Sequence, residues 1–417
     1  MKKIVIKGRV IDATGSDAIE NGVVVVEDNK IVQVGPSKAV DIPNDAEIIE
    51  IEEGTIMPGL IDAHVHMGLG TDDVRQMYDK SMPEKTCIAI KELEACIDAG
   101  FTSVREVGGF LNTIKTSLEI LGYKAPRIAA SGRFIGQTNG HSDAYKGFPL
   151  EMQERTGLGA IADGVDECIK TARIQFRQGA DFLKIGTTGG GTSQGDKLSS
   201  CEYTMEEIKA FVQEAKNNGT YVACHAHTIA GIKNAIRGGV KSIEHCTKVD
   251  DEAIQMLLDN DCYFVPTFSI GQSYLDVLDS MPLFVQEKVA ELGEPARGLN
   301  MCEVAGERYA KAFKAGVKMG LGSDLLGDPK LPYGKNAREF ELFVQYVGLT
   351  PMEAIIVGTK NNSELMMMED KIGTLEEGKL ADLIIVKGNP LEDISLLTNP
   401  DNVKVVIKDG KIQKNIV

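Results

Sequence analysis

The sequence predicts an α/β protein, a (β/α)8 TIM-like barrel joined to a small β-sandwich domain formed from both chain ends. Three observations lead to this fold class. Eight short apolar runs in the middle of the chain are mostly followed by helical patterns. Both ends of the chain alternate like β-strands. Five of the six histidines stand at the expected carboxyl ends of strands, where a barrel places its functional residues.

The two ends of the chain are expected to build the β-sandwich domain from residues 1–55 and 375–417. Each end carries short segments rich in β-branched residues. The expected strands are Lys3–Ile11, Gly22–Val34, Ala381–Val386 and Val403–Ile407. Neither pair can bury a core alone, so we expect the two ends to pack together, with the barrel, residues 56–374, inserted between them.

The central segment repeats a strand followed by a helix. The candidate strands are Ile56–Ala63, Phe101–Arg105, Arg127–Ser131, Phe182–Ile185, Tyr221–Cys224, Ser242–Glu244, Tyr263–Thr267 and Met319–Gly322. Helical patterns lie between most of them, for example at Met205–Asn217 and Ala230–Arg237. An open doubly wound sheet is the alternative, and it is disfavoured because no glycine-rich dinucleotide fingerprint follows the first strand.

Composition excludes several classes of partner. The chain has 417 residues, 43% of them hydrophobic and 25% charged, and a formal net charge of −16. An acidic surface repels nucleic-acid phosphates and anionic lipid, so neither is an expected partner. No apolar run is long enough for a membrane span, and Lys7 and Arg9 interrupt the first apolar stretch, so we expect a cytoplasmic protein. The eight cysteines form no Cys-x-x-Cys pair.

The histidines at strand ends predict a metal site. His64 and His66 are two residues apart in the first strand, so both side chains point to the same face. His225 ends the fifth strand, His245 the sixth and Asp324 the eighth. All these side chains therefore fall at one level of the barrel. Four imidazoles and one carboxylate are suitable ligands for two divalent metal ions, most simply Zn²⁺.

Lys184 ends the fourth strand and is predicted to point into the barrel, where an unpaired ammonium is costly. One interpretation is a lysine paired with a carboxylate. The other is that desolvation lowers its pKa and the neutral amine takes up CO2, giving a carbamate that can bridge the two metals. His225 and His227 also leave a choice open, because both face inward and only one is needed as a ligand.

Several segments together resemble a known family. They are Pro58–His66, Lys184, His225, Ser242–His245, Asp324 and Gly373–Leu383. They resemble the amidohydrolase superfamily, in particular its prolidase-like and Xaa-Arg or Xaa-Lys dipeptidases, with imidazolonepropionase and ochratoxin-hydrolysing relatives. The resemblance spans nearly the whole chain. It implies a carboxylated lysine at Lys184 and makes His225 the ligand on the fifth strand.

Two further segments are candidate substrate contacts. The segment Phe134–Asp143 resembles the family's Gly-Gly-His region beside the substrate and departs from it by Asn139 in place of a glycine. It makes His141 a candidate for substrate binding and catalysis. The loop Gly186–Gly195 lacks the ending of a phosphate-binding loop, and its Gly189 and Gly190 could bring backbone N–H groups close to a substrate.

The predicted function is hydrolysis of an amide bond in a small molecule by a metal-activated hydroxide. The substrate is expected to be a dipeptide, of Xaa-Pro or Xaa-Arg/Lys type, or an N-acyl amino acid. Asp324 would carry the proton to the leaving amine, Lys184 would bridge the metals, and His227 and His141 would contact the substrate. The alternatives are a cyclic amide hydrolase, a heterocycle deaminase and a non-catalytic binding barrel. A homo-oligomer is possible.

Overall fold

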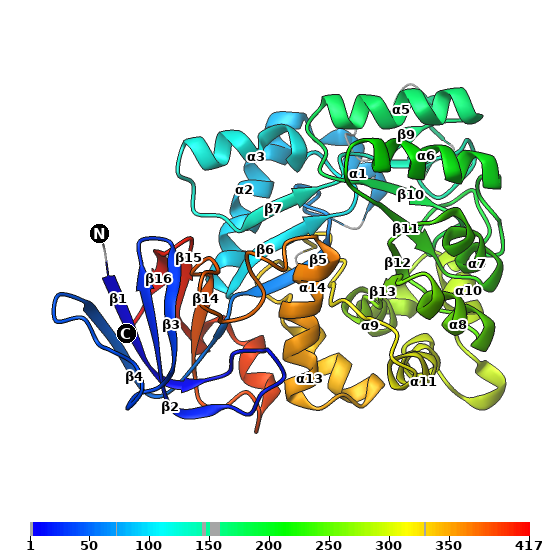
Figure 1. Cartoon of the computed structure of the whole chain (residues 1–417). Helices are drawn as coiled ribbons and strands as arrows, with labels where there is room; N and C mark the ends of the chain where they lie inside the picture. The colour runs from blue at the N-terminus through cyan, green and yellow to red at the C-terminus, as the bar shows by residue number, and fades with distance from the viewer. Residues whose placement is uncertain (1–2, 72, 144–146, 151–158, 329–330) are drawn as a thin grey trace.

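The computed structural model describes residues 3–71, 73–143, 147–150, 159–328 and 331–417. Figure 1 shows a small sheet at one side of the molecule, beside a larger body of strands covered by helices. Both chain termini lie in the small sheet. The protein is therefore an α/β structure with a separate sheet made from the two ends of the chain.

The small sheet has seven strands in the order β16-β15-β14-β4-β1-β2-β3. They are β1 (Lys3–Val10), β2 (Ile19–Glu27), β3 (Lys30–Pro36), β4 (Glu47–Pro58), β14 (Leu383–Lys387), β15 (Val403–Lys408) and β16 (Lys411–Asn415). The predicted sandwich is thus one continuous hydrogen-bonded sheet. Its two halves share a single apolar core, in which Ile4 and Val24 lie together with Leu383 and Val405. Register shifts interrupt the pairing of β1, β2, β14 and β15, and irregularities of this kind bend and twist a strand locally.

The small sheet continues directly into the central strands at Gly59. β4 pairs with β1 as far as Ile56 and with β14 as far as Pro58, and β5 (Leu60–Val65) then pairs with a different strand. The strand expected at 56–63 is therefore divided between two sheets. A Cβ on Gly59 would lie 2.1 Å from Oγ1 of Thr102, so only glycine allows the chain to cross here.

The central strands pair only in parallel within two sheets, of orders β5-β6-β7 and β13-β12-β11-β10-β8-β9. The remaining strands are β6 (Phe101–Glu106), β7 (Arg127–Ala130), β8 (Phe134–Gly136), β9 (Gly159–Ile161), β10 (Leu183–Gly186), β11 (Val222–Ala226), β12 (Ser242–His245) and β13 (Tyr263–Val265). The segment expected as the eighth strand lies between β13 and β5, through parallel bridges from Met319 to Phe264 and from Leu325 to Val65.

Helices cover the outside of these strands (Figure 1). The α-helices are α1 (Val74–Asp79), α2 (Met82–Asp98), α3 (Leu111–Ile120), α5 (Val165–Arg177), α6 (Met205–Asn217), α7 (Ile229–Gly238), α8 (Asp251–Asp259), α9 (Phe268–Val277), α10 (Leu283–Leu292), α11 (Met301–Lys314), α12 (Arg338–Leu342), α13 (Pro351–Ile356) and α14 (Asn362–Leu365). Capping boxes at Ser81, Thr204 and Asn300 fix the starts of α2, α6 and α11.

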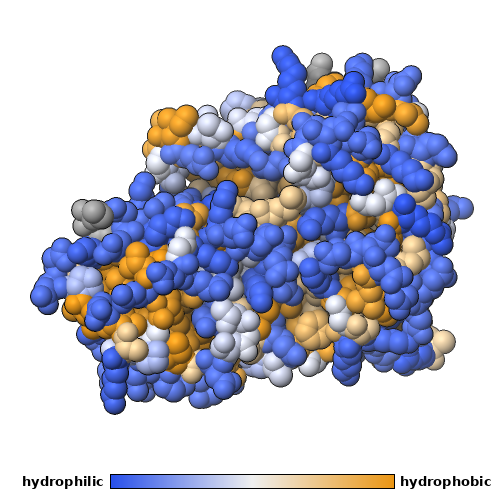
Figure 2. All heavy atoms as spheres, viewed as in Figure 1, coloured by the Kyte–Doolittle hydropathy of each residue, from blue (hydrophilic) through white to orange (hydrophobic). Residues whose placement is uncertain are grey.

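The surface is mainly hydrophilic on the face shown in Figure 2. An apolar group stands out near the end of α3, where Ile120 and Leu121 are 79% and 70% exposed. Within the described part of the chain, no helix combines the length and the apolar character needed to cross a bilayer.

Candidate metal centre

The predicted ligands come from five different places in the chain and meet at one end of the central strands. His64 lies in β5, Lys184 in β10, His225 in β11 and His245 at the end of β12. Asp324 follows the bridge-forming segment beside β5, and its N–H donates to the carbonyl oxygen of His64. Because parallel strands carry their carboxyl ends at the same edge, these side chains converge there.

A first group of ligand atoms is formed by His64, His66 and Asp324. The Nε2 atoms of the two histidines are 3.3 Å apart. Oδ1 of Asp324 lies 3.3 Å from Nε2 of His64 and 3.2 Å from Nε2 of His66. Ligands about 2.0–2.2 Å from a tetrahedral zinc ion are separated by roughly 3.3–3.6 Å. The three atoms therefore have the spacing that a single zinc-like ion requires.

A second group is formed by His225, His227 and His245, whose candidate ligand atoms all lie within 4.8 Å of one another. The ring of His225 is 4.6 Å from that of His245 and 4.7 Å from that of His227. Nδ1 of His245 is 4.0 Å from Oδ2 of Asp324, the second oxygen of a carboxylate that already contacts the first group. The two groups therefore adjoin at Asp324.

Lys184 is a buried cation with no hydrogen-bonding partner. Its side chain is 2% exposed, and its Nζ makes no hydrogen bond. It lines a cavity that is also lined by His64, His66 and His225. Burial lowers the pKa of Lys184 to about 8, so its neutral form is accessible near neutral pH. Glu244 and Asp324 act on its charge electrostatically, but among the described residues no carboxylate forms a hydrogen bond with its Nζ.

Four of the five histidines in the two ligand groups are held by their outer nitrogen. Nδ1 lies 2.8 Å from an oxygen in each pair: His64 with Glu244, His66 with the carbonyl of Gly108, His227 with Thr247, and His245 with Thr267. Contacts of this kind fix the ring orientation and the tautomer of metal-binding histidines. They leave each Nε2 free to face the centre.

His225 is oriented in the opposite way. Its Nε2 lies 3.3 Å from the carbonyl oxygen of Gly189, which makes Nδ1 the nitrogen available to an ion. Burial lowers the pKa of His225 well below its ordinary value, and neighbouring His141 and His245 lower it further. A neutral imidazole is the form that binds a metal.

Glu244 and Arg105 are functional residues that the sequence analysis missed. Both side chains are fully buried, and Nη2 of Arg105 donates to Glu244 Oε1 at 2.8 Å and to Oε2 at 2.9 Å. Burial would raise the pKa of Glu244, but Arg105, Lys184 and His64 hold it well below its usual range. The anionic Glu244 thereby orients His64. The signal in the sequence that could have identified Glu244 and Arg105 is a charged residue within an otherwise apolar strand.

Asp62 connects the first strand of the site to the segment that carries Asp324. Its Oδ1 accepts from the backbone N–H groups of His64 and Ser323. Its Oδ2 accepts from the hydroxyl of Ser323 and, at 2.7 Å, from the side-chain amide of Asn336. These bonds fix the position of Asp324 relative to His64.

Residues with left-handed backbone conformation gather around the centre. His245, Cys246, Thr267 and Asp324 have φ values of 69°, 56°, 59° and 55°. This conformation is unfavourable for residues with a side chain and recurs in turns and at functional sites. Here it turns the chain at the strand ends, so that His245 and Asp324 point into the centre.

His141 is anchored by a buried polar chain from the loop after β10. Its Nδ1 lies 2.8 Å from the hydroxyl of Ser193, which donates to Asp196 at 2.6 Å. Lys288 of α10 completes the chain by donating to Asp196 and to the carbonyl oxygens of Gly190 and Ser193. The ring of His141 lies 4.3 Å from that of His225, which places it beside the metal-ligand candidates.

The backbone groups of Gly189 and Gly190 have partners within the protein. The N–H of Gly190 donates to Asp196 and is therefore not free for a substrate, while the carbonyl of Gly189 contacts His225. A Cβ on Gly190 would meet the His141 ring at 2.1 Å, so close packing explains this glycine. Gly191 and Thr192 line the cavity instead.

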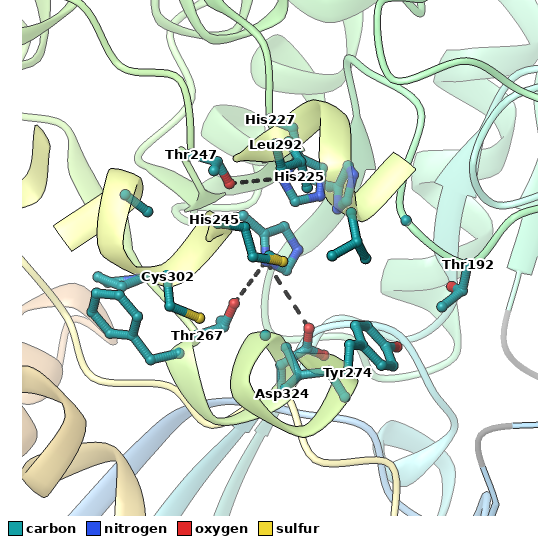
Figure 3. Close-up of a pocket in the computed structure, with 18 of the residues that line it drawn as sticks. Thr192, His225, His227, His245, Thr247, Thr267, Tyr274, Leu292, Cys302 and Asp324 are labelled. Carbon is teal, nitrogen blue, oxygen red and sulfur yellow. Dashed lines mark hydrogen bonds and ion pairs between the residues drawn. The ribbon is translucent and has the colours of Figure 1, made fainter. Parts of the chain in front are cut away.

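A cavity opens onto the centre (Figure 3). His245 lies in its middle, with contacts to Thr267 and Asp324, and Thr192 and Tyr274 lie on its rim. His141, His225 and His227 also line it.

The amidohydrolase family profile matches residues 55–413. Ochratoxinase from Aspergillus niger is 31% identical over 433 residues, covering 99% of this chain and 86% of that protein. A prolidase complexed with N-methylphosphonate-L-proline is 30% identical, with a TM-score of 0.89 and complete coverage of both chains. A Xaa-Pro dipeptidase with methionine bound in its active site is 32% identical, with a TM-score of 0.84 and 99% coverage of both chains.

The chain belongs to the amidohydrolase family. This confirms the predicted superfamily with its prolidase-like relatives, and it confirms the expectation of a hydrolase that acts on carbon–nitrogen bonds. Members of this superfamily depend on metals, which agrees with the two histidine groups described above.

Proposed function

We propose that this protein is a binuclear metal-dependent hydrolase that cleaves the amide bond of a dipeptide or an N-acyl amino acid. The observation that carries the proposal is the arrangement of two ligand groups that adjoin at Asp324, with the unpaired Nζ of Lys184 facing the same cavity. The similarity to an ochratoxinase, a prolidase and a Xaa-Pro dipeptidase supports an amide substrate.

We further propose that the central strands close into the (β/α)8 barrel predicted from the sequence. The segment from Met319 to Leu325 supports closure, because it bridges β13 on one side and β5 on the other. On the opposite side, the N–H of Asp181, just before β10, donates to the carbonyl of Ala130 in β7. The domain limits of 1–55, 56–374 and 375–417 remain part of this proposal.

The donor set fits two zinc-like ions. His64 and His66 would hold one ion, and His225 and His245 the other, with Asp324 on the first and a carbamate of Lys184 between the two. When bound, such ions lower the pKa of a shared water and polarise the scissile carbonyl. The neutral amine is the form of lysine that can react with CO2. Lys184 is close to this form, because its Nζ has no hydrogen-bonding partner and burial lowers its pKa.

The remaining polar groups have proposed roles in proton transfer and substrate binding. Asp324 takes the proton of the attacking water and delivers it to the leaving amine. His141 and His227 contact the substrate and stabilise the charge that develops on its carbonyl oxygen. Burial lowers the pKa of His141 to about 4 and that of His227 to about 3, so both act as neutral hydrogen-bonding groups.

Substitution of His225, in β11, and of His227, just after that strand, separates a ligand from a substrate contact. His225→Ala should lose one metal ion per chain, because it removes the nitrogen left free by the contact of Nε2 with Gly189. His227→Ala should keep both ions and lose about 10- to 100-fold in kcat/KM. Metal content and kinetics of both variants check this. Loss of metal in the His227 variant alone would reverse the assignment.

A substrate panel tests the proposed reaction. It contains Xaa-Pro and Xaa-Lys dipeptides, N-acyl amino acids, a cyclic amide and an aminated heterocycle, and it measures released amino acids and ammonia separately. We expect amino acids to be released from linear amides. Ring opening or ammonia release without cleavage of any linear amide would replace the proposal with a cyclic amide hydrolase or a deaminase.

A further inference from the structure

One side of the cavity beside the metal centre is apolar. It extends from the histidines towards α9, α10 and α11, and Leu292 and Cys302 are visible there in Figure 3. The apolar lobe is formed by Phe268, Ile270, Val289, Leu292, Met301 and Ala305. Among the described residues that line the whole cavity, Asp324 is the only one with a formal charge, and it belongs to the metal centre.

We propose that this apolar lobe is the specificity subsite of the enzyme and holds an uncharged, large aliphatic or aromatic group of the substrate. The inference rests on the proposed amide hydrolysis and names the substrate class within it. A Lys or Arg side chain would lose its hydration in this lobe without finding a counter-charge. Of the dipeptide classes expected from the sequence, the lobe therefore favours apolar side chains over basic ones.

The residues that form the lobe are connected to the metal centre by hydrogen bonds. Tyr309 of α11 lies on its wall, and its hydroxyl donates to the carbonyl oxygen of His245 at 2.5 Å. Val289 and Leu292 stand on the same helix as Lys288, whose three hydrogen bonds fix α10 to the loop after β10. A group seated in the lobe is thus held in a fixed position relative to the metal ligands, as specificity requires.

A second cavity accommodates the rest of the substrate. Outside the residues that it shares with the first cavity, it is lined by Leu69, Met77, Phe134 and Lys184, among others. The two cavities share several residues, namely His141, Thr192, His225, His245, Ile270, Tyr274 and Asp324. A scissile amide placed at the shared residues would have one substituent in each cavity, so only one of its two substituents occupies the apolar lobe.

Two variants change the lobe without touching the metal ligands. Ala305→Leu fills it, and should lower about 100-fold the ratio of kcat/KM for amides that carry a Leu or Phe side chain to kcat/KM for Gly- and Ala-containing amides. Met301→Glu adds a charge at the first turn of α11, where a helix stabilises an anion. It should raise the kcat/KM for Lys- and Arg-containing amides at least about tenfold relative to wild type. Ala290→Leu is the matched control, because Ala290 is exposed on α10 and does not line the lobe.

The experiment measures kcat/KM for a panel in which the acyl side and the amine side carry Gly, Leu, Phe, Lys or Arg in turn, together with the metal content of each variant. We expect wild type to prefer Leu or Phe over Lys or Arg by about 100-fold on one side of the bond. Equal cleavage of basic and apolar substrates, or loss of all activities in Ala305→Leu with normal metal content, would overturn the subsite and leave amide hydrolysis intact. Absence of cleavage of every amide would instead overturn the proposed function.

Discussion

Replacing Asp324 with asparagine is expected to lower kcat by about 10²–10⁴-fold, the range for loss of a positioned acid–base group. The carboxylate contacts His64 and His66 through Oδ1 and leaves Oδ2 towards His245. Burial would raise the pKa of Asp324, but His64 and His66 hold it well below its usual range, so it is an anion. An amide cannot accept that proton, although it has nearly the same shape.

The measurement compares kcat and metal content of Asp324→Asn with those of Asp370→Asn, a change at an exposed aspartate. The backbone bond from Asp324 to His64 is unaffected by the substitution, so the variant should fold and retain at least one metal ion. Activity within threefold of wild type would show that Asp324 does not transfer the proton.

The second large effect is expected from Lys184. Lys184→Ala should lose the bridge between the two ions and at least about 10²–10³-fold in kcat, the range for removal of one stabilising group at a reaction centre. An unmodified ammonium at this position would instead repel both cations. If Lys184 were only a structural residue, its replacement by alanine would therefore not cause this loss of kcat. A small carboxylate added to the variant should restore part of the activity by occupying the position of the carbamate.

Lys209→Ala, at an exposed position of α6, is the control for the loss of a lysine. Electron density for the metal-loaded wild-type enzyme, prepared with bicarbonate and without acid, provides an independent check. An unmodified Lys184 in that density, or full activity of Lys184→Ala, would contradict the carbamate.

The sequence could predict the positions of the ligand candidates because they obey local rules. His64 and His66 are two residues apart in a strand, and a period of two places both side chains on one face. His225, His245 and Asp324 each follow an apolar run, and parallel strands bring such positions to a common edge. These rules depend only on neighbours in the chain, so they can be applied before the structure is known.

The contacts that orient the ligands could not be predicted, because they join distant parts of the chain. Arg105 reaches Glu244 across 139 positions, and Lys288 reaches Asp196 across 92. The division of the first expected strand at Gly59 likewise depends on the approach of Thr102 from another strand. Pairings of this kind arise from the three-dimensional path of the chain, and no local pattern in the sequence specifies the partner.

Metal titration tests the central claim most directly. Protein freed of metal with a chelator is titrated with Zn²⁺, and amide hydrolysis is followed together with the number of ions bound per chain. We expect no activity in the metal-free protein, full activity on binding of two ions per chain, and loss of binding sites in His64→Ala and His245→Ala. Full activity in metal-free protein, or saturation of activity with no ion at either histidine group, would contradict a binuclear hydrolase.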